Sequence, residues 1–327
     1  MDYPLDFASA YGQVTATGNI RCQPDDFQVD EVLGFEPCGE GEHLYMHIRK
    51  TGLNTLQLAG RLAGWAGIHS KDVGFAGLKD RHAVTSQWFS LYLPIARDLD
   101  WQLLADDQLE LLGQARHRTK LRRGDHKANR FRLKVRNFSG DADQLSQKIA
   151  QIATEGVPNY FGEQRFGHGG SNLNGAHAMW SSSRREKNRQ LRGFYLSAAR
   201  AWLFNRLLSE RVTAGCWRKA VEGDCLEPET GFPTGPLWGR GRLPTRDQAL
   251  VLESKLSRDY PLFCDGLEHA GLKQERRSLV LQPKALHADL STLAMSAGFE
   301  ISFELPGGAF ATSLLAELVN WTDSHKN

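Results

Sequence analysis

The stretch Gly74-Phe75-Ala76-Gly77-Leu78-Lys79-Asp80-Arg81-His82-Ala83-Val84-Thr85-Ser86-Gln87 is the part of this chain that indicates most about its fold. It predicts a short apolar strand over 73–76, a charged turn, and a second strand over 83–93. The turn presents one carboxylate, Asp80, between Lys79 and Arg81. Flanking cations favour the ionised form of an aspartate, and an ionised, positioned carboxylate can act as a nucleophile or as a base. An ordinary solvated turn has the same charge pattern, so other segments must decide between the two interpretations.

Length and composition predict the class of protein. A chain of 327 residues favours two domains, and 41% hydrophobic with 24% charged residues is typical of a globular protein with a sizeable core. The first residues lack the pattern of a secretory signal, and no apolar run is long enough to cross a bilayer. The five cysteines are widely spaced and form neither a disulfide framework nor a zinc pair. We therefore expect a cytoplasmic protein without membrane association.

Positive charge is concentrated in one segment. Ten Lys or Arg and one acidic residue lie between Gln114 and Arg136, so this segment carries +9 while the rest of the chain carries −7. Candidate contacts to a nucleic-acid backbone are Lys120, Arg122, Arg123 and Lys127, together with Arg184 and Arg185 in a second basic cluster. The alternative for both clusters is a solvated basic loop.

Hydrophobic periodicity predicts further strands over 27–33, 43–49, 129–136 and 299–305. It predicts helices over 55–66, 141–154, 194–211 and 246–256, and another beginning at Thr312 or Ser313 and reaching Val319. The dense Gly and Pro of 215–243 indicate loops. Strand 129–136 has the clearest alternation, with one row of Asn129, Phe131, Leu133 and Val135 and the other row entirely basic. We expect the first row to face the core; because neighbours in a row are about 6.7 Å apart, Asn129 and Phe131 can lie together at the edge of the core, within reach of a ligand.

The known patterns of several metal, nucleotide and catalytic sites are incomplete or absent in this sequence. The segment from Gly162 to Gly167 has the spacing of a P-loop, but His168 and Gly169 stand where Lys and Ser or Thr are required. His43 and His47 fall in a segment of period two, and no Glu completes a metalloprotease pattern. No dinucleotide-binding fingerprint or Gly-x-Ser-x-Gly elbow is present. We therefore expect no metal, no nucleotide and no other cofactor.

Four separated segments, taken together, resemble the tRNA pseudouridine synthase D (TruD) family. They are Pro24-Asp25-Asp26-Phe27-Gln28-Val29-Asp30-Glu31, the segment from Gly77 to Gln87, Asn129-Arg130-Phe131, and Phe303-Glu304-Leu305-Pro306-Gly307-Gly308-Ala309-Phe310-Ala311-Thr312. The segment Pro158 to Gly167 is also typical of this family. The matches occur in the family's order over nearly the whole chain.

The resemblance implies an enzyme that isomerises uridine to pseudouridine in tRNA, at position 13, with the target base flipped out of its stack. Asp80 falls on the family's catalytic aspartate. Phe27, Asn129 and Phe310 fall on positions expected to contact the target nucleotide, and Phe131 on an aromatic that lines the base pocket. Whether Asp80 attacks the sugar or base as a nucleophile, or removes the proton at C2′, stays open.

The resemblance also implies an α+β pseudouridine synthase fold with a mixed, mostly antiparallel sheet and an inserted α/β domain. The catalytic domain is expected over 1–154 and 287–327, with the inserted domain over 155–286 and the protein a monomer. Arg21 is the expected partner of Asp80, where the family often has Lys; Ala309 replaces a common Ser. Two other classes remain as alternatives: a structured-RNA-binding protein without catalysis, and a carboxylate-dependent hydrolase of nucleosides.

Overall fold

The structure is a computed structural model that describes residues 3–94, 99–182, 186–293 and 298–324. They form two compact units, each assembled from three parts of the chain. Unit 1 comprises Met1–Val14, Ala150–Gln282 and Ala309–Leu318, and unit 2 comprises Thr15–Ile149, Pro283–Gly308 and Val319–Asn327. The division into a catalytic domain over 1–154 and 287–327 and an inserted domain over 155–286 stays a prediction.

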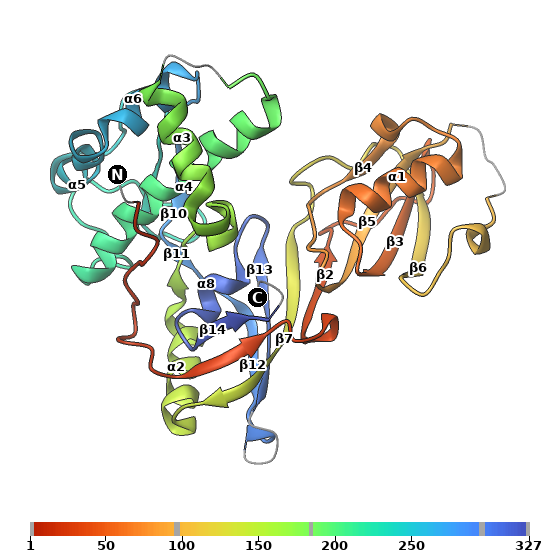
Figure 1. Ribbon diagram of the computed structural model, residues 1–327, viewed down its shortest axis with the longest axis horizontal. Helices are drawn as coiled ribbons and strands as arrows, with labels where there is room; N and C mark the ends of the chain where they lie inside the picture. Colours follow the sequence, from red (N-terminus) through yellow and green to blue (C-terminus); the bar gives the residue numbers. More distant parts are fainter. Residues whose placement is uncertain (1–2, 95–98, 183–185, 294–297, 325–327) are drawn as a thin grey trace. The chain divides into compact units, whose positions relative to one another are not determined.

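Unit 2 is built on one sheet whose main path runs β12-β13-β7-β2-β5-β3-β6 (Figure 1). Strand β1 pairs with β7 and β14, and β4 pairs with β5. Only the β1–β14 and β2–β5 pairs of this described sheet are parallel. The predicted mixed, mostly antiparallel sheet of an α+β fold is therefore confirmed. The strands are β1 Thr17–Ile20, β2 Phe27–Val32, β3 His43–Thr51, β4 Val73–Phe75, β5 Val84–Tyr92, β6 Leu109–His117, β7 Ala128–Ser139, β12 Lys284–Asp289, β13 Phe299–Pro306 and β14 Asn320–Asp323.

Strand β7 lies between β2 and β13 and shows why the sequence alternates. Its row of Asn129, Phe131, Leu133 and Val135 is buried, as predicted, while Arg130 and Arg132 on the other row are exposed. Phe131 stands opposite Val29 of β2 and Phe303 of β13, so three strands bring apolar side chains to one place. Such cross-strand contacts fix the register, because a slip of one residue would expose the whole buried row.

Helix α1, Thr55–Ala66, packs its apolar side on the sheet beside β3 and β5 (Figure 1). The Asn54 side chain accepts a hydrogen bond from the Gln57 backbone, and the Gln57 side chain accepts one from the Asn54 backbone, which is a capping box. Gly67 ends the helix in the left-handed region, with φ of 61°. The cluster beneath α1 includes Leu58 and Leu62, both fully buried. This helix and its ends match the predicted range.

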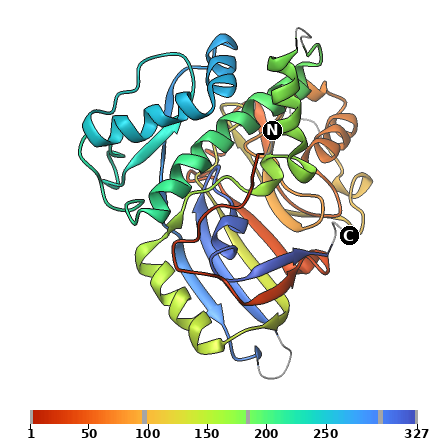
Figure 2. The ribbon, with the colours of Figure 1, turned by 60° about the vertical axis from the view of Figure 1, so that its left-hand side comes forward.

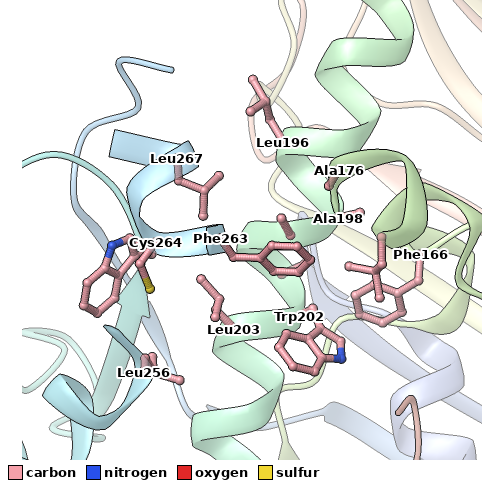
Figure 3. Packing of buried hydrophobic residues seen from close by; sticks show 14 of the residues in the cluster. Phe166, Ala176, Leu196, Ala198, Trp202, Leu203, Leu256, Phe263, Cys264 and Leu267 are labelled. Carbon is pink, nitrogen blue, oxygen red and sulfur yellow. The ribbon is translucent and has the colours of Figure 1, made fainter. Parts of the chain in front are cut away.

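Unit 1 is mostly helical and packs around the long helix α4. Its core joins Trp202 and Leu203 of α4 to Phe263 of α6 and Leu256 of α5 (Figure 3). Burying each large apolar side chain contributes about 1.5–3 kcal/mol. The elements of unit 1 are β8 Val157–Pro158, α3 Ser171–Ser181, α4 Arg189–Thr213, β9 Thr234–Leu237, α5 Asp247–Asp259, α6 Pro261–His269, β10 Glu275–Ser278, β11 Val280–Leu281 and α8 Ala311–Leu315. Helix α2, Ala142–Glu155, includes the point at which the chain passes from unit 2 to unit 1.

The N-terminal segment belongs to the core of unit 1 and lies beside α4 (Figure 2). The ring of Tyr3 stacks on Phe263 at 4.6 Å, and Trp202 Nε1 donates a hydrogen bond of 3.0 Å to Pro4 O. In the same unit, Ala10 N donates to the Glu317 carboxylate at 3.0 Å. Both ends of the chain therefore contribute to unit 1, which the sequence did not indicate.

The structure adds elements that the sequence analysis did not predict, notably α3 and α6 in unit 1. Helix α3 contains Asn172, Asn174 and Gly175, which are weak helix formers, and α6 is nine residues long with Gly266 in its middle. A Cβ at Gly266 would lie 2.3 Å from the Trp180 ring of α3, so this glycine allows the two helices to approach closely. The predicted helix through Val319 is shorter and ends at Leu315. No helix in the described residues combines the length and the apolar character that crossing a membrane requires.

Candidate active site

The candidate site lies in unit 2 on the loop between β4 and β5, which carries Asp80. The backbone of this loop is fixed by hydrogen bonds from the parts of the chain around it. These bonds run from Lys79 N to Thr55 Oγ1 (2.8 Å), from Lys50 Nζ to Asp80 O (3.0 Å), from Gln87 Nε2 to Gly77 O (3.3 Å), and from Arg81 Nε to Gly52 O (3.0 Å). The loop is therefore a fixed element of the fold and can hold a side chain in a defined place.

Lys50 is the fully buried cation of this set. Its Nζ also donates to Leu53 O at 2.5 Å, so one ammonium group links the loop after β3 to the Asp80 loop. Burial lowers the pKa of Lys50 to about 8, against the opposing effect of the Asp80 charge. The sequence analysis missed Lys50, although it follows Met46 and Ile48 on the buried row of β3, where a lysine is unusual.

The Asp80 side chain is 44% exposed and has one cationic partner within ion-pair distance in the described residues. Arg21 Nη2 lies 3.2 Å from Asp80 Oδ2. The other carboxylate oxygen, Oδ1, accepts a hydrogen bond of 3.2 Å from the His82 backbone. Asp80 is thus oriented from two sides and still open to a substrate.

Arg21 joins Asp80 to the sheet. Its Nη1 donates to Asp323 Oδ2 of β14 at 2.9 Å, and its guanidinium carbon lies 4.0 Å from the centre of the Phe27 ring. A cation over an aromatic face contributes about 0.5–1 kcal/mol or more. Arg21 has a φ of 54°, a left-handed conformation that is uncommon for a residue with a side chain. Sequence analysis missed Asp323, because it lies about 300 residues from Arg21 in the chain.

The residues next to Asp80 point elsewhere. Lys79 Nζ donates a short hydrogen bond to Asn129 Oδ1 and lies 2.9 Å from Glu31 Oε2, while Arg81 binds a backbone carbonyl. The ion pair of Asp80 is therefore made by Arg21, as expected from the resemblance, and not by the sequence neighbours that the charged turn suggested. Glu31 lies in the first of the four family segments, but the sequence did not indicate a role for it.

The predicted aromatic residues belong to two units. In unit 2, Phe27 and Phe131 are buried and meet edge to face at 6.3 Å, and Phe131 also stacks on Phe303 at 5.4 Å. Phe310 belongs to unit 1, where its ring contacts Phe161 at 5.9 Å. The structure therefore brings Asp80, Arg21, Phe27, Asn129 and Phe131 into one unit, and it places Phe310 in the other.

The basic segment is less available than its charge suggests. Three cations of β7 form ion pairs: Arg130 with Glu304, Lys134 with Glu300, and Arg136 with Asp26. The proposed backbone contacts lie instead in the loop before β7, where Arg122, Arg123 and Lys127 are exposed and Lys120 Nζ donates to Lys71 O. Arg184 and Arg185 lie outside the described residues. In the part of the chain that the structure describes, no three His, Cys, Asp or Glu side chains come together to hold a metal ion.

Comparisons with known proteins identify the family of this chain. A family model described as tRNA pseudouridine synthase D (TruD) matches residues 10–178 and 171–235. The chain belongs to the TruD family. Curated members that it resembles include the tRNA pseudouridine synthase D of Cellvibrio japonicus, 45% identical over 98% of this chain and 94% of that protein, and that of Methylococcus capsulatus, 44% identical over 97% and 95%.

The fold agrees with this membership. A crystal structure from Methanosarcina mazei, described as a candidate tRNA pseudouridine synthase D (TruD), superposes with a TM-score of 0.66 at 21% identity. It covers 100% of this chain and 97% of the other. The predicted pseudouridine synthase fold is therefore confirmed, and so is the resemblance to the TruD family from which it was predicted.

Proposed function

We propose that this chain isomerises uridine to pseudouridine in tRNA at position 13, and that Asp80 is the carboxylate on which the reaction depends. The isomerisation itself follows from membership of the TruD family, whose relatives compared above are named as synthases. The non-catalytic RNA-binding alternative finds no support there. The position in tRNA and the roles of the residues belong to the proposal.

One observation carries the role of Asp80: a half-exposed carboxylate on a fixed loop, paired with a mostly buried arginine. The reaction breaks the C1′–N1 bond, turns the uracil and joins C1′ to C5, so every atom of the nucleotide is retained. Attack by Asp80 and removal of the C2′ proton both require a carboxylate that is held in place and open to the sugar. Arg21 holds the carboxylate in place, and the exposure of the Asp80 side chain leaves it accessible to the sugar.

The remaining residues receive roles that fit their surroundings. Asn129 lies on the buried row of β7 and offers an amide to a polar edge of the flipped base. Phe27 and Phe131 would contact the target nucleotide, with stacking worth about 1–3 kcal/mol per base. The nucleotide contact expected of Phe310 stays a prediction. Lys120, Arg122, Arg123 and Lys127, with Arg184 and Arg185, would bind phosphates. We further propose a cytoplasmic monomer that needs neither metal nor nucleotide cofactor.

The test is product analysis of tRNA labelled in uridine. After incubation with the full chain, nuclease digestion and chromatography should yield labelled pseudouridine and no free uracil. A transcript with cytidine at position 13 should yield none. Free uracil would indicate the nucleosidase alternative, and equal product from the cytidine-13 transcript would remove position 13 from the proposal.

A further inference from the structure

Asn129 has a fixed orientation because of the lysine beside Asp80. Asn129 is 8% exposed, and its side-chain oxygen accepts a hydrogen bond from Lys79 Nζ. An ammonium group can only donate hydrogen bonds. The oxygen of the Asn129 amide must therefore face Lys79, and the amide nitrogen must face the opposite way.

Lys79 is itself held from the other side by Glu31. Glu31 stands directly opposite Asn129 on the neighbouring strand β2, so the two side chains lie on one face of the sheet. Lys79 Nζ lies 2.9 Å from Glu31 Oε2 and forms an ion pair with it, but the geometry is not that of a hydrogen bond. The other carboxylate oxygen, Glu31 Oε1, accepts a hydrogen bond of 3.1 Å from the Trp88 backbone. Lys79, Glu31 and Asn129 are all buried. The directed hydrogen bond of the lysine thus goes to Asn129.

The nitrogen side of the same amide remains available. In the described residues Asn129 Nδ2 makes no hydrogen bond, and it is not among the polar atoms that the fold closes off from solvent. A ligand that reaches Asn129 therefore meets N–H donors and no acceptor. This sign matters for base recognition, because uracil presents a carbonyl acceptor, O4, where cytosine presents an amino donor.

We propose that Lys79 is a positioning residue that locks the Asn129 amide with its N–H groups toward the base, so that position 129 accepts uracil through O4 and rejects cytosine. The inference rests on the proposed function and deepens it. Without Lys79 the amide can turn over and present its oxygen, which suits the amino group of cytosine. Through Asn129, Lys79 therefore controls which base is accepted, and it is the residue next to the reacting carboxylate Asp80.

The first experiment is Asn129→Asp, which keeps an oxygen for Lys79 and removes the N–H donors. We expect kcat/KM on uridine tRNA to fall at least tenfold, with thermal unfolding close to the wild type. That fall follows from the loss of one buried hydrogen bond and from an acceptor placed against O4. Turnover within twofold of the wild type would show that the base does not need an N–H donor at position 129, and would overturn the proposal.

The second experiment tests the lysine through one atom of the substrate. Tight recognition of O4 should make a tRNA with 4-thiouridine at the target position a poorer substrate, because sulfur accepts hydrogen bonds weakly. We expect the ratio of kcat/KM for uridine over 4-thiouridine to fall about fivefold in Lys79→Met and in Asn129→Ala. It should be unchanged in Lys148→Met, which removes an equally buried lysine from α2.

An unchanged ratio in Lys79→Met would contradict the lock, since a structural lysine would lower both rates alike. If Lys79→Met does not fold, Lys79→Arg decides, because a donor-only cation must retain the wild-type ratio and an altered ratio overturns the proposal. The outcome is separable from that of the proposed function. Formation of pseudouridine by the wild type tests the activity, and the ratio tests only the lock.

Discussion

Two Arg–Asp pairs, one in each unit, show opposite uses of the same two residues. In unit 1, Arg211 and Asp224 make two parallel contacts of 2.7 Å, and their side chains are 2% and 1% exposed. In unit 2, Arg21 and Asp80 make one contact of 3.2 Å, and their side chains are 11% and 44% exposed. The first carboxylate is enclosed by its partner, whereas Arg21 contacts one oxygen of the second and the His82 backbone donates to the other.

The difference separates an ion pair that stabilises the fold from an ion pair that orients a carboxylate for chemistry. The Arg211–Asp224 pair also ties a loop to α4, because Arg211 donates to Cys216 O and Asp224 accepts from Val221 N. Such a pair has no room for a substrate, and breaking it leaves a buried charge without a partner. Asp80 is 44% exposed and makes one contact with its arginine, so this pair contributes less to stability and leaves the carboxylate accessible to a substrate.

The largest expected effect concerns the enclosed pair. Asp224→Asn should lower the free energy of unfolding by about 3–5 kcal/mol, because Arg211 stays buried while the negative charge that compensates it is gone. Denaturant titration measures the change. Turnover per folded molecule should stay within about twofold of the wild type, and a turnover defect without loss of stability would contradict the comparison.

The next effect concerns Lys50, the buried cation under the Asp80 loop, whose pKa is lowered to about 8 from 10.5. Between these values the unfolded chain holds the proton more firmly than the folded one, so the contribution of Lys50 to stability improves as pH rises. The free energy of unfolding of the wild type minus that of Lys50→Met should therefore rise by up to about 3 kcal/mol between pH 8 and pH 10.5. A flat or falling difference would mean that Lys50 is not charged and buried as described.

Arg21 should show a loss of rate and not of binding. Arg21→Met removes the partners of Asp80 and Asp323 together and should lower kcat about 100-fold, because the carboxylate loses its fixed position. The Kd for tRNA should change less than threefold. Arg21→Lys keeps the charge without the two-armed geometry and should fall between the wild type and Arg21→Met; equal rates in all three proteins would remove Arg21 from the site.

The smallest effect concerns arginines that remain exposed. Replacing Arg122 by Gln should weaken tRNA binding and reduce the slope of log K against log salt by roughly 0.7–0.9. Arg130→Gln is the matched control, because Arg130 is engaged with Glu304. An equal change in slope for both variants would show that the ion pairs of β7 open on binding RNA.

Sequence reasoning reached the parts of the site that lie within one segment. The alternation of β7 predicted the row of Asn129 and Phe131, and the charged turn predicted a loop at Asp80. The ion pairs depended on distant segments, since Arg21, Asp80 and Asp323 meet only after β1 has paired with β14. The sequence also did not indicate where the Lys79 side chain points, because a lysine beside an aspartate gives no sign that its partners lie on β2 and β7. Periodicity predicted that Phe27 and Phe131 face the core, but the stacking of Phe131 on Phe303 depended on the pairing of β7 with β13.

The most direct test of the account is the rate of pseudouridine formation by Asp80→Asn, measured together with its unfolding. The substitution keeps the size of the side chain and removes the charge that Arg21 holds. We expect the rate to fall at least about a thousandfold while the free energy of unfolding changes by less than about 1 kcal/mol. Near-normal product formation by the folded variant would contradict the assignment of Asp80.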